Sequence, residues 1–168
     1  MYKLEDANHL EKYLDDSSFI LQEWLDPRQG EYTSGVYLGD DGSVKGVCTF
    51  RRKLKGGSTY IAERIIDRKL EEPLEEIAKS IGMKYLNIQS MRRGNKLVPF
   101  EFNGRLSGST AMVAHVFNAP EMFIRERLLA MPIERNLNTD EFVVMRYYDE
   151  IYASESKIKA LLLRSNEI

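Results

Sequence analysis

Residues 100–110 read FEFNGRLSGST, and they place a polar side chain at every second position of an apparent strand. These side chains are the carboxylate of Glu101, the carboxamide of Asn103 and the guanidinium of Arg105. Residues two apart on a strand share a face of the sheet. We therefore expect Glu101, Asn103 and Arg105 to converge on one surface, where they would meet a partner.

A preceding strand is expected to bring a third oxygen donor to this surface. Residues 84–91 (KYLNIQSM) and 96–105 (KLVPFEFNGR) read as strands joined by the turn RRGN. A turn this short makes the two strands antiparallel neighbours, so Gln89 can reach the face that carries Glu101 and Asn103. Three side-chain oxygens in one small volume suit a hard cation such as Mg2+, with Arg105 placed to pair with an anion. The alternative is a solvated strand face, which is common in half-exposed antiparallel sheets.

The rest of the chain alternates between strand-like and helix-like segments. Besides the hairpin above, strands are expected at 18–25 (buried), 31–53 (a hairpin around Asp41 and Gly42) and 141–153. Helices are expected at 7–16 after an Asp6 cap, in two segments between Gly57 and Gly82 with Pro73 in a first turn, and at 109–117, 120–131 and 155–164. This mixed order predicts an α+β domain built on an antiparallel β-sheet with helices packed on one face.

Composition predicts one domain over residues 1–168. The chain is 43% hydrophobic and 30% charged, which is enough for a single core. A formal net charge of −2 gives no general attraction to nucleic acid or to an anionic membrane. Cys48 is the only cysteine, no apolar run approaches the roughly 20 residues of a membrane span, and no secretory signal is evident. We expect a cytoplasmic protein that binds neither nucleic acid nor membrane.

Two stretches of the sequence together resemble a known family. Residues 85–89 (YLNIQ) and 100–110 resemble the signature of ATP-grasp carboxylate–amine ligases, especially the carbamoyl-phosphate synthase large-subunit branch, where a Gln, a Glu and an Asn ligate two Mg2+ ions. Residues 19–44 are similar to the family's hinge strand at the adenine pocket, followed by a Gly-Glu pair that holds the ribose. The resemblance is strongest over residues 18–130.

The resemblance implies a role for each matching residue and names the cofactors, ATP and Mg2+ or Mn2+. Glu23, Trp24 and Leu25 would contact the adenine, and Glu31 would hold the ribose. Gln89, Glu101 and Asn103 would ligate the metal ions, and Arg105 would contact the transferred phosphate or the acyl substrate. One departure from the family pattern is Gly104, where the family usually has Pro.

A larger departure is the missing first lobe of the ATP-grasp clamp. The residues before Phe19 contain no glycine-rich loop followed by a lysine. The chain therefore resembles the C-terminal lobe alone, and a separate chain or a missing segment would supply the other lobe. The implied function is the ATP- and Mg-binding half of a ligase that forms an acyl phosphate from an unidentified carboxylate and passes it to an amine or similar nucleophile. We expect little turnover from this half alone, because phosphoryl transfer depends on positioning and charge neutralisation.

Two further functions stay open: a non-catalytic nucleotide-binding module that acts through a partner chain or as a homo-oligomer, and an interaction domain without nucleotide affinity. Smaller features also keep two interpretations each. The basic run Arg51, Arg52, Lys53 and Lys55 would either steer phosphates or be a solvated strand end. The run Ser107–Thr110 would either hold an anion or cap a helix. Cys48, His9 and His115 are expected to be packing or surface residues.

Overall fold

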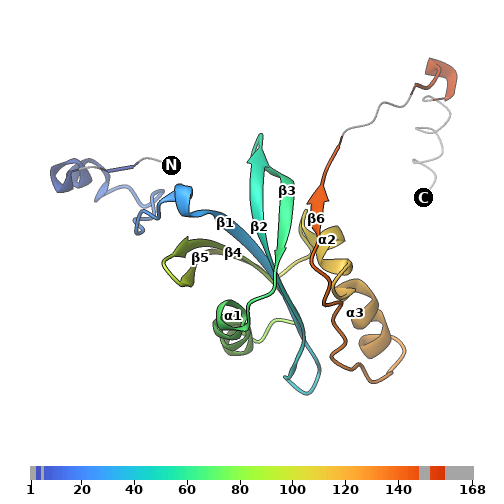
Figure 1. Cartoon of the computed structure of the whole chain (residues 1–168). Helices are drawn as coiled ribbons and strands as arrows, with labels where there is room; N and C mark the ends of the chain where they lie inside the picture. Colours follow the sequence, from blue (N-terminus) through green and yellow to red (C-terminus); the bar gives the residue numbers. More distant parts are fainter. Residues whose placement is uncertain (1–2, 5, 148–151, 158–168) are drawn as a thin grey trace.

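The computed structural model describes residues 3–4, 6–147 and 152–157, and its centre is a twisted antiparallel sheet (Figure 1). Six strands pair within these residues, in the order β5-β4-β1-β2-β3-β6. They are β1 (Glu31–Leu38), β2 (Val44–Lys55), β3 (Ser58–Ile65), β4 (Tyr85–Arg93), β5 (Lys96–Asn103) and β6 (Val143–Met145). The helices are η1 (Ala7–Tyr13), η2 (Pro27–Gln29), α1 (Arg68–Ile81), α2 (Thr110–Ala114) and α3 (Ala119–Arg127). The expected α+β class and both predicted hairpins are confirmed.

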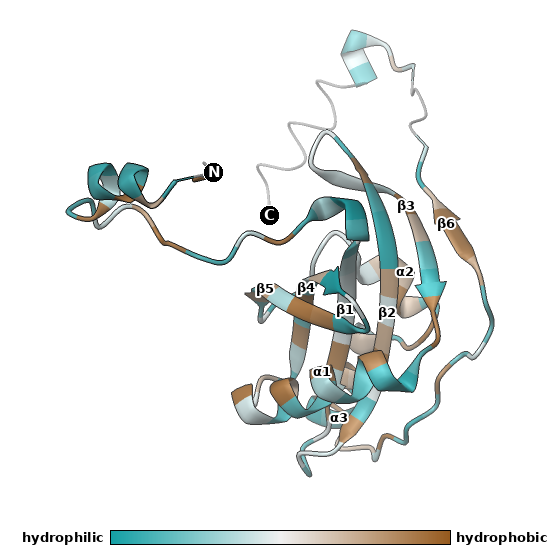
Figure 2. Cartoon of the chain, turned by 60° about the vertical axis from the view of Figure 1, so that its left-hand side comes forward, coloured by the Kyte–Doolittle hydropathy of each residue, from teal (hydrophilic) through white to brown (hydrophobic). Residues whose placement is uncertain are grey.

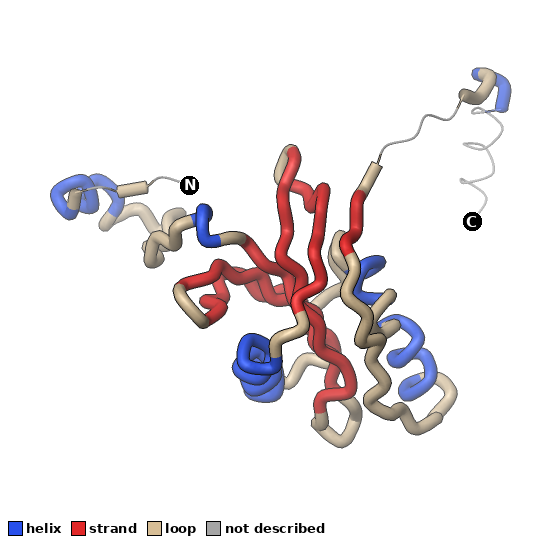
Figure 3. Tube along the Cα trace, viewed as in Figure 1, coloured by secondary structure: helices blue, strands red, loops and turns tan. Residues whose placement is uncertain are grey.

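The N-terminal segment departs most from expectation. Asp6 does cap a helix, η1, by accepting from the N–H of Asn8. Residues 18–25, however, form no strand, and the side chains of Ile20 and Trp24 are 89% and 50% exposed. A strand needs a neighbour that takes up its backbone hydrogen bonds, and this segment extends away from the sheet in two views (Figure 2 and Figure 3). The predicted buried strand is wrong for this part of the chain.

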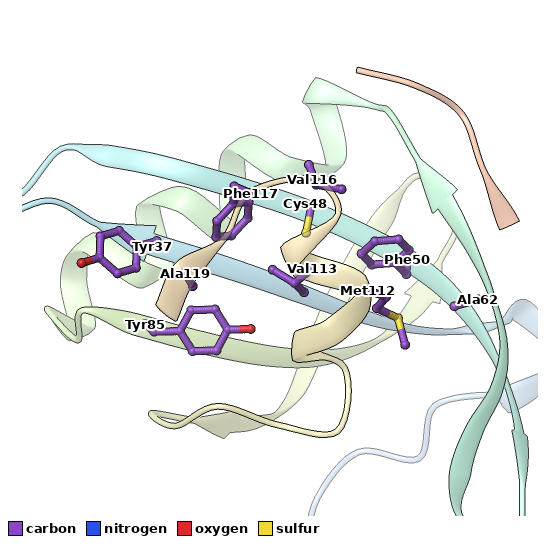
Figure 4. Close-up of a cluster of buried hydrophobic side chains, with 10 residues drawn as sticks. All are labelled: Tyr37, Cys48, Phe50, Ala62, Tyr85, Met112, Val113, Val116, Phe117 and Ala119. Atoms are coloured by element: carbon purple, nitrogen blue, oxygen red, sulfur yellow. The ribbon is translucent and has the colours of Figure 1, made fainter. Parts of the chain in front are cut away.

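Side chains of neighbouring residues in β1 point into two different hydrophobic clusters. Val36 packs in a cluster that includes Leu74 and Ala78 of α1. Tyr37 packs in the cluster of Figure 4, with Val113 of α2 and Phe117 just after it. The expected helix packing on one face is thus provided by α1. The sequence did not predict the second layer, in which α2 and the start of α3 cover the opposite face.

Helix α1 begins and ends as its sequence predicts, but it is one continuous helix. Asp67 caps it by accepting a hydrogen bond from the backbone N–H of Lys69 at 2.9 Å, and Gly82 ends it with φ 73°. Pro73 lies inside the helix, so its expected place in a first turn is wrong. A proline inside a helix costs about 3 kcal/mol. Burial of Leu70 and Leu74 offsets this cost, at about 1.5–3 kcal/mol for each side chain.

The predicted helical region between Gly57 and Gly82 is wrong at its beginning, over residues 58–65. They form strand β3, which pairs with β2 from Thr49 to Lys55. Their side chains largely alternate between exposed and buried positions, and Thr59, Ala62 and Arg64 are buried. That period of two belongs to a strand. The Gly56–Gly57 turn therefore closes a third hairpin.

The last described segment returns along the sheet after α3. Ile133, Leu137 and Phe142 pack against the cluster of Figure 4. Strand β6 then pairs with β3 over three residues, and the described residues 141–142, 146–147 and 152–153 of the predicted strand 141–153 are not strand. Residues 148–151 of that prediction lie outside the described residues. Residues 155–157 are helical, and most of the predicted helix 155–164 lies outside the described residues. Within the described ranges, none of the helices combines the length and the apolar character that crossing a membrane requires.

Candidate functional site

Five polar side chains lie on the sheet face opposite α1, and strand register places them there. Gln89 of β4 is the Cα partner of Glu101 of β5 and of Thr33 of β1. Asn103 shares the face of Glu101 and donates a hydrogen bond from Nδ2 to its Oε1 at 2.7 Å. On the other side of β4, Glu31 of β1 is the partner of Arg52 of β2. We call these residues the polar array: Glu31, Arg52, Gln89, Glu101 and Asn103.

Arg52 links the two halves of the polar array. Its guanidinium donates to the Oε1 atoms of both Glu31 and Gln89. The side chains of Arg52 and Glu31 are only 11% and 19% exposed. Such shielding makes the ion pair stronger than one on an open surface. Arg52 therefore occupies one predicted metal ligand, Gln89, and the predicted ribose residue, Glu31.

Strand alternation divides the basic run between the two faces of the sheet. Arg52 and Ala62 are Cα partners on the face of the polar array, whereas Arg51 pairs with Glu63 on the face of α1. The four basic residues are thus not one patch. Only the order of the strands could have singled out Arg52, because the position that it shares with Glu31 and Gln89 depends on β1 lying between β2 and β4.

A buried hydrogen-bond network lies next to the polar array. Asn87, which is 2% exposed, donates from Nδ2 to Thr33 Oγ1 at 2.9 Å, to the Ser34 carbonyl at 3.2 Å and to Ser109 Oγ at 3.2 Å. Ser109 Oγ also lies 2.7 Å from Ser107 Oγ. This network fixes the 107–110 loop beside β4. Sequence reasoning missed Asn87, although its place two residues before Gln89 was a usable signal.

The same network explains the run Ser107–Thr110. Ser109 occupies the N-cap position of α2 but makes no side-chain cap hydrogen bond. Its hydroxyl bonds with Asn87 and Ser107 instead. Asn87 of β4 therefore anchors the loop to the sheet, and the expectation that Ser109 makes an ordinary cap hydrogen bond is wrong.

Arg105 does not share the strand face of Glu101 and Asn103. Strand β5 ends at Asn103, which pairs with Asn87, and residues 104–105 form a bend. The Arg105 guanidinium donates to the carbonyl of its neighbour Leu106 at 3.2 Å. The expected convergence of three strand positions is therefore wrong for Arg105, because alternation no longer applies once the chain leaves the ladder.

The predicted adenine-pocket residues lie apart from the polar array. Glu23 forms an ion pair with Arg93 at the end of β4, and the Trp24 ring lies 5.6 Å from Lys3 Nζ. Leu25 follows in the same irregular segment. Glu31, the predicted ribose residue, does join the predicted metal ligands, but here Arg52 binds its carboxylate. Of the eight predicted site residues, the structure brings together Glu31, Gln89, Glu101 and Asn103.

The donor chemistry of the polar array fits a hard cation. It offers two carboxylates and two carboxamides, and oxygen donors of this kind suit Mg2+ or Mn2+. Among the residues that the structure describes, no three His, Cys, Asp or Glu side chains gather at one point. Metal binding by Gln89, Glu101 and Asn103 stays a prediction.

Two other candidate residues have packing roles. Cys48 is fully buried, and burial raises the pKa of its thiol to about 12. A thiol with such a pKa is not a nucleophile near neutral pH. The ring of His115 packs edge-on against Phe142, with 4.7 Å between the ring centroids. Both findings agree with the expected packing roles.

Comparison with known proteins identifies the fold. No family model matches the sequence, and no curated protein matches it. Similar solved structures include N5-carboxyaminoimidazole ribonucleotide synthetase from Thermus thermophilus, with a TM-score of 0.54 and 15% identity over 68% of this chain. The phosphoribosylaminoimidazole carboxylase ATPase subunit from Aquifex aeolicus has a TM-score of 0.57 and 14% identity over 80%. N5-carboxyaminoimidazole synthase from Aspergillus clavatus, solved with ADP and its ribonucleotide, has a TM-score of 0.58 and 13% identity over 80%.

This chain spans 35%, 43% and 39% of the length of those three proteins. At these identities the likeness concerns the fold. Assignment to the specific carbamoyl-phosphate synthase branch stays a prediction, whereas the assignment of the fold is supported. The chain has the ATP-grasp fold of the C-terminal part of such ligases.

Proposed function

We propose that the chain binds MgATP through the polar array and serves as the C-terminal lobe of an ATP-grasp ligase. One observation carries the proposal: Gln89 and Glu101 are Cα partners on adjacent strands, and Asn103 is hydrogen-bonded to Glu101 at 2.7 Å. The fold supports it, since neighbours of the same fold are synthetases solved with ADP.

In this proposal Gln89, Glu101 and Asn103 hold the cation, which neutralises charge on the nucleotide phosphates. Arg52 then has to release Gln89, and its guanidinium is free to pair with a phosphate oxygen on the same face. Glu31, once released by Arg52, can accept hydrogen bonds from the ribose hydroxyls. The 107–110 loop stays in place, because Asn87 and Ser109 are bonded to each other beneath it.

The reaction proposed for the complete enzyme is formation of an acyl phosphate from a carboxylate and ATP, followed by attack of an amine or a similar nucleophile. Glu101 of the polar array is exposed, and solvent has to be excluded from reactive phosphates. A second lobe, from another chain or segment, is therefore proposed to cover the polar array. Binding without turnover is the behaviour expected of the chain on its own.

Calorimetric titration of MgATP tests the proposal. The variants are Glu101→Ala, in the polar array, and Glu76→Ala, an exposed position on α1 with a side chain that is 71% exposed. Wild type and Glu76→Ala should bind equally, and Glu101→Ala should bind at least about tenfold more weakly. Chelating the Mg2+ should weaken binding to wild type to the same degree. Equal heats from wild type and Glu101→Ala would exclude the polar array as the nucleotide site.

A further inference from the structure

Helix α3 has one face fixed against the domain and one face open to solvent. On the fixed face, Glu126 accepts hydrogen bonds from the Tyr37 hydroxyl, from the backbone N–H of Asp40 at 2.6 Å and from Lys84 Nζ at 2.6 Å. Ala119 and Met122 pack against the cluster of Figure 4 on this same face. These contacts fix the rotation of α3 about its axis, and they therefore fix which of its residues face solvent.

The outward face of α3 and the residues after it carry large apolar side chains. Helical spacing places Ile124 and Leu128 on one stripe. The exposed fractions are 47% for Ile124 and 71% for Leu128, and they are 59% for Leu129 and 42% for Met131 just after the helix. We call these four residues the α3 patch. Several exposed large apolar side chains in one short segment are typical of an interaction site.

Charges beside the α3 patch select the partner. Glu121 lies near the beginning of the helix, and Arg127 lies near its end. Their side chains are 55% and 50% exposed. A parallel copy of α3 would place like charges together. An antiparallel copy related by a two-fold axis at Ile124 places each Glu121 opposite Arg127 of the other chain, because the two residues are equally distant from Ile124 in sequence.

We propose that the α3 patch docks a second copy of this chain in a symmetric dimer, with the two α3 helices packed antiparallel around Ile124. The same surface serves both subunits, as a two-fold interface requires. Arg127 already contacts Asp40 at 3.0 Å, and Glu121 already pairs with Arg125 at 3.3 Å. The five donors of the Arg127 guanidinium and the lone pairs of the Glu121 carboxylate leave both groups able to form a further bond with the second copy. The dimer does not rest on nucleotide binding.

The dimer leaves the polar array accessible. Helix α3 contacts β1 at Tyr37, whereas Glu31 begins the same strand. Six residues of strand separate the two positions by about 20 Å. A lobe that covers the polar array and a second copy on the α3 patch therefore have separate surfaces on this chain.

Sedimentation equilibrium of the full chain tests the dimer, with circular dichroism to verify that each variant folds. Wild type should reach twice the chain mass of 19.5 kDa. Ile124→Glu places two carboxylates together at the two-fold axis and should raise the dimer Kd at least about hundredfold. Ile20→Glu makes the same change in the N-terminal segment, where Ile20 is 89% exposed, and it should leave the Kd unchanged.

Charge reversal tests the antiparallel arrangement itself. Glu121→Arg and Arg127→Glu should each raise the Kd about tenfold, because each breaks two symmetric ion pairs. The double variant should recover most of the loss. A monomeric wild type at about 100 µM would overturn the proposal, as would a dimer that tolerates Ile124→Glu, or a double variant no tighter than its parents.

Discussion

Gly46 of β2 lies beneath the ring of Phe117, and adding one methyl group there tests how the second helical layer is held. A Cβ atom at Gly46 would lie 2.5, 2.6 and 2.7 Å from three ring carbons of Phe117. Ordinary contact is 3.4–4 Å, so the ring would have to move by about 1 Å in a close-packed site. Phe117 is only 3% exposed, which leaves the ring little room.

We therefore expect Gly46→Ala to lower the free energy of unfolding by about 3 kcal/mol, at the upper end of the usual cost of overpacking. For a domain of this size that loss corresponds to a fall of about 6–12 °C in Tm. Calorimetry and urea unfolding measure both quantities. The control is Gly108→Ala, because a Cβ atom at Gly108 would have nothing within 4 Å, and its stability should change by no more than about 0.5 kcal/mol.

A double-mutant cycle attributes the loss to Phe117. Replacing this ring with leucine gives the added methyl room, so Gly46→Ala combined with Phe117→Leu should be at least about 1 kcal/mol more stable than the sum of the single changes. Additive losses of unfolding free energy in the double variant, or a Gly46→Ala variant as stable as Gly108→Ala, would refute the packing of Phe117 against β2. Because Ser109 is the N-cap of α2, the same variants should also weaken MgATP binding if the layer positions the 107–110 loop.

Three further predictions follow from single side chains. Arg52→Met frees the Gln89 oxygen, so the nucleotide-free chain should bind Mn2+ about tenfold more tightly; unchanged affinity in an electron paramagnetic resonance titration would show that Arg52 does not compete with the cation. Burial raises the pKa of Glu71 to about 7 from its ordinary value of 4.5, against the opposing charge of Arg64. The folded chain should therefore lose stability as the pH rises between those values, by about 3 kcal/mol at most. Urea unfolding at about pH 5 and pH 8 should show a smaller difference for Glu71→Gln than for wild type, and equal differences would contradict the assignment. Ala130 has φ 49° after α3, so Ala130→Gly should raise the free energy of unfolding by about 0.5–1 kcal/mol, whereas a lower Tm would show that the backbone there is unstrained.

Local chemistry allowed much of the sheet to be predicted. The Asp41–Gly42 and Arg92–Asn95 turns join their strands within a few residues, so pairing and alternation follow from neighbours in sequence. The face shared by Gln89, Glu101 and Asn103 depends only on such a hairpin, and it was predicted correctly. Helix α1 was equally readable at its ends, where Asp67 and Gly82 satisfy backbone groups locally.

Residues whose position depends on distant pairing were not predictable in this way. Residues 18–25 are irregular because no neighbouring strand pairs with them among the described residues. The apolar character of this segment does not indicate whether such a neighbour exists. The buried bonds of Asn87 to Thr33 and Ser109 join residues 54 and 22 positions away. Its place two residues before Gln89 indicates the face of the strand on which Asn87 lies, but it does not indicate these distant partners.

The sequence by itself determined the alternation of β1, β2, β4 and β5 and the two hairpins that they form, because these follow from the backbone geometry of adjacent residues. The tertiary structure alone decided that β1 lies between β4 and β2, and this order places Glu31 and Arg52 beside Gln89. It also decided that Arg105 leaves the site, since a side chain keeps its face only while its strand remains in the ladder. The order of the strands is stabilised by burial of apolar side chains under α1 on one face and α2 on the other. This stabilisation comes from contacts between segments that are distant in sequence, so no single segment determines it.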